Sequence, residues 1–400
     1  MWLSKGMNVT SRRTLAALSV GALLTTLLTS FASAALDDGY PAGDAAPGRT
    51  CGDDAVGRKT VSSYSGKALS CILVNGVARW WIDGDPLPAV EVAAPASSAA
   101  PAASGGPKPA APVVAADAYM WNKGVKVSKG SKFITIAGDR PAQVLIPGSL
   151  KAKVAAPLIV ALHGFTASTS DLMSLMNLSA EAIKRGVVLA VPSGTRNNDG
   201  LTFWNATGSC CDFAGSGVDD SKYLMDLVKQ VSSKVSIDQK RIYFVGHSNG
   251  GFMSYTVACA NSDKVAAIVN LEGSTFSNPA MCKANHPVSI LQINGTADEL
   301  IHIAGGNVFD DPKQPYPSVS DETSFWAGVN GCTSKVSAIG NGTKFNYESV
   351  IAGSETTKSA YKCPKGVAVE MWTIADGHHV PKLNSAFAVA VLDFLLAHKK

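Results

Sequence analysis

The chain has 400 residues, of which 46 % are hydrophobic and 16 % are charged, and its formal net charge is only +4. This length allows one sizeable hydrophobic core. The near balance of charge argues against nucleic acid or an anionic membrane surface as the partner.

The amino terminus has the pattern of an export signal. Lys5, Arg12 and Arg13 precede an apolar stretch at residues 15–31 that is too short to be a convincing membrane span, and a small-residue cleavage site ends at Ala34. Cleavage there leaves 32 basic residues against 31 acidic ones, because three of the 35 lysines and arginines lie in the signal. We therefore predict a secreted protein with no membrane partner after cleavage. Export by the Sec or the Tat route stays open, and an uncleaved anchor is the alternative.

Residues 35–87, which follow the signal, are expected to form a small β unit closed by a disulfide. Two apolar runs, at 69–74 and 77–82, flank Asn75-Gly76, which is the strongest short-range signal for a hairpin. A unit of this size buries little core. The Trp80-Trp81 pair is suited to stack on a sugar or polymer surface, and the alternative is that it fills and shields the small core.

An Ala/Pro-rich segment at residues 88–116 predicts an extended linker, because its composition does not form a packed core. The large domain is expected over residues 117–400, where short apolar runs alternate with helical patterns. This alternation is typical of a doubly wound α/β sheet with mostly parallel strands. The expected strands cover residues 133–137, 143–146, 158–162, 187–191, 242–245, 265–270, 288–294 and 367–374, and the expected helices cover residues 170–185, 220–234, 251–260 and 385–398.

The sequence Gly-His-Ser-Asn-Gly at 246–250 follows the buried strand 242–245 and precedes the apolar run 252–260. The order strand, sharp turn, helix is that of a nucleophile elbow, in which a strained serine is lifted out at the carboxyl end of a sheet. Glycine is needed on both sides of the turn because a Cβ there would collide with the neighbouring strand or helix. Ser248 is therefore the predicted catalytic nucleophile.

A serine nucleophile needs a base, and the base needs an acid that fixes its tautomer. On this type of fold the acid and then the histidine follow the serine along the chain. Asp298 lies in the turn after an apolar strand and is the preferred acid, with Glu299 and Asp376 as competitors. His378 and His379 follow the last strand, and their position alone leaves open which of them is the base.

The tetrahedral intermediate needs backbone N–H donors that face its oxyanion. Asn249, the residue after the nucleophile, supplies one donor, and the loop after the first central strand supplies another from Phe165, with Thr166 as the second choice. His163 and His247 flank the site and are expected to shape the pocket rather than act as bases. No metal is predicted, because adjacent loop histidines point apart and lack a third ligand at a suitable spacing.

The cysteines are even in number, lie in the mature part and have no C-x-x-C spacing, which favours disulfides over a zinc or redox site. Two pairs have the spacing of local loops: Cys51 with Cys71, and Cys332 with Cys363. Cys210 and Cys211 are adjacent and are not expected to bond to each other. Each is expected to pair with Cys259 or Cys282, in an order that the sequence leaves open.

A set of short motifs recurs through the large domain: Leu162-His163-Gly164-Phe165, Trp204-Asn205 followed by Cys210-Cys211, Gly217-Val218-Asp219-Asp220, Gly246-His247-Ser248-Asn249-Gly250-Gly251 followed by Phe252-Met253, and Asn294-Gly295-Thr296-Ala297-Asp298. In combination they resemble the secreted poly(3-hydroxybutyrate) depolymerase and feruloyl esterase group, α/β-hydrolases related to carbohydrate esterase family one. The resemblance covers the chain from about residue 132 to its end and does not include the first 116 residues.

In that group the histidine loop has the form Gly, small residue, His, any residue, Pro. The matching sequence here is Gly377-His378-His379-Val380-Pro381, so the resemblance implies that His379 is the base, with His378 in place of the small residue. It further implies Ser248 as the nucleophile and Asp298 as the partner of the histidine. It also supports a disulfide between Cys332 and Cys363.

The resemblance implies a secreted serine carboxylesterase that works through an acyl-enzyme, without a cofactor, on polymer-bound or aryl esters. The expected partner is an ester substrate, either an insoluble polymer or a plant cell-wall polysaccharide. Trp204, Trp326 and His247 are the candidate substrate-binding residues, with core packing as the alternative for the tryptophans. The Gly- and Pro-containing stretch 302–325 is expected to be an irregular insertion that forms a lid or a wall of the site.

Two other functions are compatible with the same fold. The first is a polymer- or wall-binding protein in which the hydrolase domain is an inactive scaffold and the aromatic unit at 35–87 binds. The intact Ser248, Asp298 and His379 argue against it. The second is a serine peptidase, which is disfavoured because nothing here resembles the extra domain that such enzymes use to restrict access.

Overall fold

The computed structural model describes residues 56–61, 68–74, 77–82, 121–122, 125, 127–150, 154–198, 200–308 and 312–400. The predicted export signal at 1–34 and linker at 88–116 lie outside these residues. The proposed division of the chain into signal, accessory unit, linker and catalytic domain therefore stays a prediction.

The amino-terminal unit contains a small antiparallel sheet of β1 (Lys59–Val61), β2 (Ala68–Val74) and β3 (Val77–Ile82). The two apolar runs predicted to pair as a hairpin do so, with Val74 opposite Val77. Cys71 is buried in β2. Its predicted partner Cys51 lies outside the described residues, as does the turn at 75–76.

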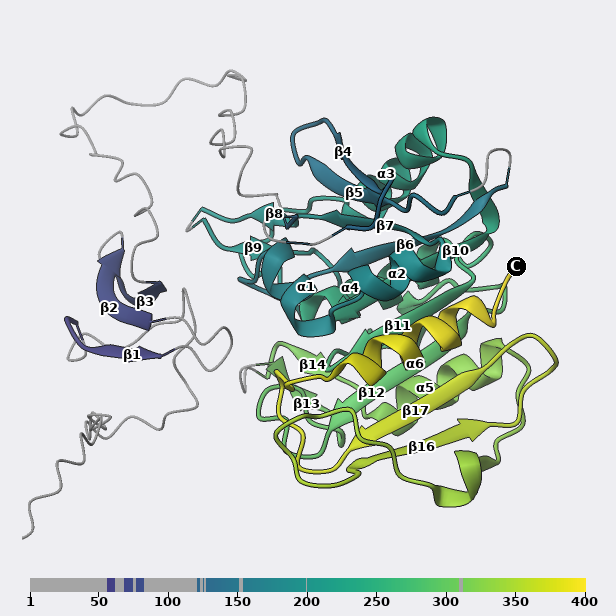
Figure 1. Ribbon diagram of the computed structural model, residues 1–400. Helices are drawn as coiled ribbons and strands as arrows, with labels where there is room; N and C mark the ends of the chain where they lie inside the picture. Colours follow the sequence, from purple (N-terminus) through teal and green to yellow (C-terminus); the bar gives the residue numbers. More distant parts are fainter. Residues whose placement is uncertain are drawn as a thin grey trace, which may run out of the picture. The chain divides into compact units, whose positions relative to one another are not determined.

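The large domain is built on a sheet with the order β15-β16-β17-β12-β11-β10-β6-β7-β5-β4 (Figure 1). The strands from β7 to β17 in this order are parallel, and antiparallel strands flank them on both sides. The predicted doubly wound, mostly parallel α/β sheet is thus confirmed. The strands are β4 (Lys132–Ile136), β5 (Ala142–Ile146), β6 (Ala156–Leu162), β7 (Val188–Pro192), β10 (Ile237–His247), β11 (Ala267–Leu271), β12 (Ser289–Gly295), β15 (Val336–Ala338), β16 (Thr356–Tyr361) and β17 (Val369–Ile374).

Helices cover both faces of this sheet, because its central strands are apolar on both sides. Along β10 the side chains alternate: Ile242 and Phe244 pack into one hydrophobic cluster, whereas Tyr243 and Val245 pack into the other. The first cluster lies under α3 (Asp220–Lys234), α4 (Asn249–Ala260) and α5 (Val319–Val329). The second lies under α1 (Thr169–Met176), α2 (Ser179–Arg185) and α6 (Ser385–Leu396), which Figure 1 shows on one side of the sheet.

Two parts of the large domain differ from the sequence-based expectation. The single helix expected at 170–185 is two helices, because Asn177 adopts a left-handed conformation (φ 46°) that ends α1. The stretch 302–325 is less irregular than expected. It contains the short hairpin of β13 (Gly306–Asn307) and β14 (Pro315–Tyr316) and the first half of α5. A second short pair, β8 (Thr195–Arg196) with β9 (Thr202–Phe203), lies in the long loop after β7.

The predicted pairing of the central cysteines is wrong. Cys259, near the end of α4, is bonded to Cys282, and their Cα atoms are 4.8 Å apart, within the ordinary range for a disulfide. Cys259 and Cys282 are therefore not available to pair with Cys210 or Cys211. Cys210 and Cys211 are bonded to each other, contrary to expectation. The predicted local pair Cys332–Cys363 is confirmed.

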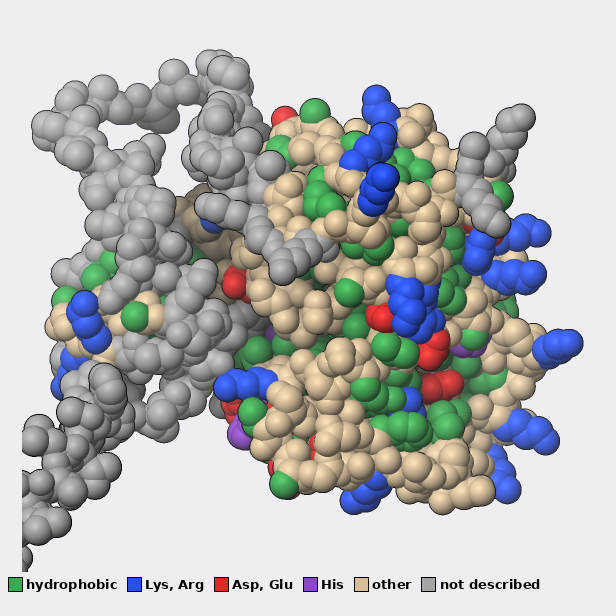
Figure 2. All heavy atoms as spheres, in the orientation of Figure 1, with side chains coloured by type: hydrophobic (Ala, Val, Ile, Leu, Met, Phe, Trp, Pro, Cys, Tyr) green, Lys and Arg blue, Asp and Glu red, His purple; other side chains and the backbone are tan. Residues whose placement is uncertain are grey.

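The surface of the large domain carries charges of both signs. On the face drawn in Figure 2, lysine and arginine side chains are dispersed, and some of them lie next to acidic ones. Within the described residues, no helix is both long enough and apolar enough to cross a membrane.

Candidate active site

Ser248 lies in the turn between β10 and α4 and has a strained backbone, with φ 54° and ψ −122°. Its N–H donates to the Leu271 carbonyl at 2.8 Å, which ties the turn to the neighbouring strand β11. A Cβ at Gly246 would lie 2.0 Å from the Gly250 carbonyl oxygen, and a Cβ at Gly250 would lie 2.1 Å from the Leu162 oxygen. Both glycines are therefore required by the close approach of strand, turn and helix.

Three predicted residues meet at the carboxyl edge of the parallel strands. Asp298 follows β12 and His379 follows β17, and parallel strands place their carboxyl ends on one edge of the sheet. His379 Nε2 lies 2.9 Å from Ser248 Oγ. His379 Nδ1 lies 3.0 and 2.9 Å from Asp298 Oδ1 and Oδ2. The order serine, histidine, carboxylate is the arrangement that nucleophilic catalysis by serine requires; the individual catalytic roles stay predictions.

The carboxyl group of Asp298 is held in its charged form. Its Oδ1 accepts hydrogen bonds from the Leu300 and Ile301 N–H groups, each at 2.8 Å. Burial works to raise the pKa of Asp298, but the charge and hydrogen bond of His379, with the backbone donor at Ile301, lower it to about 2. A carboxylate in this position fixes a proton on His379 Nδ1 and leaves Nε2 free to accept one from Ser248.

The two adjacent histidines of the last loop point in different directions. His379 is buried against Asp298, whereas the side chain of His378 is 71 % exposed and lies 3.3 Å from Glu299 at the surface. Only His379 reaches both Ser248 and Asp298. Its backbone carbonyl accepts a hydrogen bond from His247 Nε2 at 2.8 Å, so the residue before the nucleophile anchors the histidine loop.

The expected oxyanion donors lie around the same serine. Asn249 is the first residue of α4, so its N–H is one of those that have no partner within the helix. Its side-chain amide donates to the Trp204 carbonyl and accepts from the Trp204 N–H, which fixes the start of the helix. The N–H of Thr166 donates to the Thr202 carbonyl at 2.8 Å. Between the two residues proposed for the second donor, this bond favours Phe165 over Thr166.

His163 is a buried, neutral part of the loop beside the serine. Its Nε2 accepts a hydrogen bond from the Gly194 N–H at 2.9 Å, and its Nδ1 donates to the Gly164 carbonyl at 2.7 Å. Burial lowers the pKa of His163 to about 4, and burial likewise lowers the pKa of His247 to about 3. Both histidines are therefore neutral at pH 7, as expected for residues that shape the site without acting as bases.

The three predicted substrate-binding residues are almost fully buried. Trp204 lies behind the site, where its Nε1 donates to the His163 carbonyl at 3.0 Å. His247 has 1 % of its surface exposed. Trp326 lies in the core, stacked on Tyr255, and the structure does not bring it to the serine. A substrate-contacting role for these residues stays a prediction that their burial does not favour.

The motif at 217–220 has a structural explanation. Asp219 caps α3 by accepting the Lys222 N–H at 2.8 Å. The buried Asp220 pairs with Arg140 and accepts the Asn205 N–H at 2.7 Å. These contacts hold the segment next to Trp204, so the two acids support the loop beside the site without facing the serine.

One residue of the site was not singled out from the sequence. Glu272 follows β11 directly, is fully buried, and adopts a left-handed backbone conformation with φ 51°. Its Oε1 accepts the Gly295 N–H at 2.7 Å in the turn that carries Asp298, and burial together with the charge of Asp298 raises the pKa of Glu272. The sequence feature that could have indicated Glu272 is a single acid between an apolar strand and Gly273, at the sheet edge where the catalytic loops were expected.

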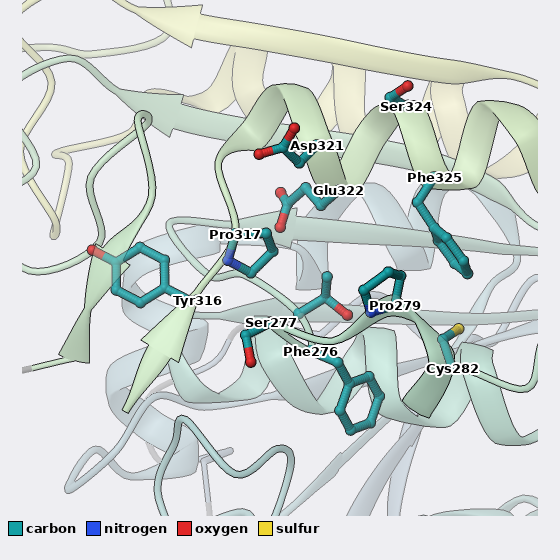
Figure 3. Close-up of a pocket in the computed structure, with 11 residues that line it drawn as sticks. Phe276, Ser277, Pro279, Cys282, Tyr316, Pro317, Asp321, Glu322, Ser324 and Phe325 are labelled. Carbon is teal, nitrogen blue, oxygen red and sulfur yellow. The ribbon is translucent and has the colours of Figure 1, made fainter. Parts of the chain in front are cut away.

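A pocket of about 540 Å³ lies beside this region, between α5 and the loop after β11 (Figure 3). Phe276, Pro279 and Phe325 give it an apolar wall, and the Glu322 side chain extends into it from α5. The loop reaches the pocket from Gly273, where an added Cβ would lie 2.6 Å from the Ser248 carbonyl oxygen. Within the described part of the chain, no group of three or more His, Cys, Asp or Glu residues is arranged to hold a metal ion.

Comparisons with known proteins point to esterases. Residues 214–313 match the model of the Phospholipase/Carboxylesterase family. The chain is 30 % identical over 247 residues to feruloyl esterase B of Piromyces equi, covering 60 % of this chain and 42 % of that protein. It is 24 % identical over 256 residues to the bifunctional acetylxylan esterase/xylanase XynS20E of Neocallimastix patriciarum, covering 64 % of this chain and 33 % of that protein. The chain thus spans less than half the length of these relatives.

Among solved structures, an acetyl xylan esterase from Aspergillus awamori aligns with a TM-score of 0.48 and 14 % identity, covering 67 % of this chain and 99 % of that one. The resemblance to the feruloyl esterase group is confirmed by the sequence relatives. The α/β-hydrolase fold is confirmed by the family match together with the observed sheet order. The likeness to poly(3-hydroxybutyrate) depolymerases stays a prediction.

Proposed function

We propose that this protein is a secreted carboxylic ester hydrolase that acts on feruloyl- or acetylxylan-type esters through an acyl-enzyme on Ser248. The observation that carries the proposal is the continuous hydrogen-bonded chain from Asp298 through His379 to Ser248 Oγ. The substrate class rests on the similarity to a feruloyl esterase and an acetylxylan esterase. Secretion rests on the export pattern of the first 34 residues.

In the acylation half-reaction, His379 Nε2 takes the proton of Ser248 Oγ as that oxygen attacks the ester carbonyl. Asp298, on the other side of the ring, stabilises the positive charge that His379 acquires. The N–H groups of Asn249 and Phe165 donate hydrogen bonds to the oxyanion of the tetrahedral intermediate. The intermediate collapses when His379 returns the proton to the leaving alcohol, which leaves the acyl group on Ser248.

Deacylation follows the same proton path. Water replaces the alcohol, His379 removes one of its protons, and the resulting oxygen nucleophile attacks the acyl carbonyl. The second tetrahedral intermediate uses the same two N–H donors. When it collapses, His379 returns the proton to Ser248 Oγ, and the free acid leaves.

The pocket beside α5 is suited to hold part of the substrate. Aromatic and proline side chains offer flat apolar surface, and Ser277 on the loop and Glu322 on α5 offer polar groups in the same pocket (Figure 3). Such a mixture matches an aromatic acid or a sugar ring, which present apolar faces and hydroxyl groups. Within the 302–325 stretch, Tyr316 at the end of β14 and the following Pro317 line the pocket, so this insertion forms a wall of the proposed substrate pocket.

The proposal is tested with Ser248→Ala, assayed on methyl ferulate, acetylated xylan and a hydroxybutyrate oligomer side by side. We expect kcat/KM to fall by at least about 10⁴-fold, because the nucleophile is removed. Ser254→Ala is the matched control, since Ser254 is buried in α4 and its hydroxyl bonds only within the helix, to the Gly250 carbonyl. Retention of full activity by Ser248→Ala would refute the mechanism.

A further inference from the structure

Both the backbone and the carboxyl group of Glu272 are held in place. It is fully buried, and its backbone has a left-handed φ of 51°, a conformation that favours glycine. Its N–H donates to the Ile293 carbonyl at 2.9 Å, and its Oε1 accepts the Gly295 N–H at 2.7 Å. These two bonds tie the end of β11 to the end of β12, three residues before Asp298.

The second carboxyl oxygen of Glu272, Oε2, is buried without a hydrogen-bond partner among the described residues. The Gly295 N–H that Oε1 accepts belongs to the turn that carries Asp298, whose own N–H donates to the Gly295 carbonyl at 3.4 Å. Both acids are buried at this junction, and two ionised carboxylates there repel each other, which favours a proton on one of the pair.

The surroundings decide which acid holds the proton. Asp298 accepts two backbone N–H bonds and faces His379, all of which stabilise a negative charge. Glu272 accepts a single backbone N–H, and the charges that act on it most, those of Asp298 and Glu299, are negative. Burial, followed by the charge of Asp298, raises the pKa of Glu272 well above its ordinary value.

We propose that Glu272 is a positioning residue for the triad: as a neutral carboxylic acid, it donates a hydrogen bond to the Asp298 carboxylate and fixes the orientation of His379. This inference rests on the proposed function, because it concerns the same Ser248 centre. A neutral donor satisfies the Asp298 oxygen and limits its rotation without adding charge. It also draws electron density from Asp298, so that the proton stays on His379 Nδ1.

The first test compares Glu272→Gln with Glu272→Ala. Glutamine keeps a neutral donor toward Asp298 and an acceptor for the Gly295 N–H, whereas alanine removes both. We expect Glu272→Ala to lower kcat by about 10- to 100-fold, the loss that one buried hydrogen bond predicts, with KM within about twofold of the wild type. Glu272→Gln should keep kcat within about threefold of the wild type.

The pH profile separates a positioning role from a purely structural one. The titratable groups around the pair are Glu299, His247 and His379. If Glu272 is neutral, Glu272→Gln leaves the acidic limb of the kcat/KM profile in place. Glu272→Ala moves this limb to higher pH, because Asp298 without its donor stabilises the protonated form of His379 more strongly. If Glu272 were ionised, Glu272→Gln would remove a negative charge and move the limb to lower pH. Either that shift or equal behaviour of the two variants would overturn the proposal.

The protonation state is also measured directly by infrared spectroscopy at pH 7. The wild type should show a protonated-carboxyl C=O band that is missing from Glu272→Gln. Glu322 is the matched control, since it is a second buried acid whose pKa is raised by burial but whose carboxyl accepts from Ser274 Oγ instead of the Gly295 N–H. Its own band is identified with Glu322→Gln. An unchanged band in Glu272→Gln would show that Glu272 is ionised.

The activity assays and the infrared comparison together keep this inference distinct from the proposed function. If the wild type hydrolyses no ester, the proposed function fails, and the infrared comparison still tests whether Glu272 is neutral. If the wild type is active but the band or the pH limb contradicts the expectation, the inference fails and the esterase mechanism stands.

Discussion

Two regions of the same sheet edge place the catalytic groups by different physical means. At the turn between β10 and α4, close backbone contacts hold Ser248: added Cβ atoms at Gly246 and Gly250 would lie 2.0 and 2.1 Å from carbonyl oxygens. In the loops after β12 and β17, side-chain and backbone hydrogen bonds hold Asp298 and His379. The nucleophile is therefore positioned by steric exclusion, and its partners are positioned by polar contacts.

The difference predicts how each region responds to change. A sterically held turn tolerates no added atom but is insensitive to pH, because none of the packed backbone groups titrates. A hydrogen-bonded loop tolerates substitution of similar shape, yet it loses function when one charge or one donor is altered. His247 connects the two regions, since it ends β10 next to Ser248 and donates to the His379 carbonyl.

The largest effect is expected from Gly246→Ala. The added methyl group must move the start of α4 away from β10, because the atoms it meets are backbone atoms. We expect a loss of more than about 4 kcal/mol in the free energy of unfolding, together with the loss of ester hydrolysis. Denaturant unfolding followed by fluorescence measures the first quantity.

The matched control is Gly328→Ala in α5, where an added Cβ has no atom within 4 Å. Alanine in a helix interior should stabilise the protein by roughly 0.5–1 kcal/mol. Equal stability of the two variants would contradict steric positioning of the nucleophile.

The next largest effect is expected from Asp298→Asn in the hydrogen-bonded region. The amide keeps the shape and can still accept the Leu300 and Ile301 N–H groups, but it no longer stabilises a charged histidine and favours the wrong tautomer of His379. We expect kcat to fall by about 10⁴-fold with little loss of stability, which corresponds to about 5.5 kcal/mol on the barrier.

Asp376→Asn is the control for this substitution. Asp376 is the competing acid of the last loop, is exposed, and has a left-handed φ of 57° that asparagine tolerates well. Its replacement should leave kcat within about twofold of the wild type. A large loss in Asp376→Asn with none in Asp298→Asn would reverse the assignment of the acid.

The sterically defined region is also the one that the sequence predicts well. Four apolar residues followed by Gly-His-Ser-Asn-Gly define strand, turn and helix within a short stretch, so Ser248 needs no long-range information. The positions of Asp298 and His379 followed from chain order and from the rule that parallel strands end on one edge. The choice of His379 over His378 depended on the resemblance to a family, because adjacent loop residues look alike in sequence.

Features that depend on contacts between distant segments could not be predicted. The proposed role of Glu272 requires that β11 and β12 pair in register, which brings Glu272 to the turn that carries Asp298, 26 positions further along the chain. The pairing of Cys259 with Cys282 depends on the path of the loop after β11. Trp326 lies in the core because α5 packs on the sheet, and the mixed sequence of that helix did not reveal it.

The smallest effect concerns pH and the residue that joins the two regions. Burial depresses the pKa of His247 to about 3 in the folded protein, whereas the unfolded chain binds the proton near pH 6.5. The unfolded state therefore holds more protons in this window, and stability is lost as the pH falls below about 6.5. The loss of unfolding free energy that His247 causes should reach about 3 kcal/mol at pH 4.5, before Asp298 begins to titrate.

His247→Gln keeps a donor for the His379 carbonyl and does not titrate, so its unfolding free energy should fall less steeply between pH 7 and 4.5. An identical slope in the two proteins would show that the His247 ring is not held neutral at the junction.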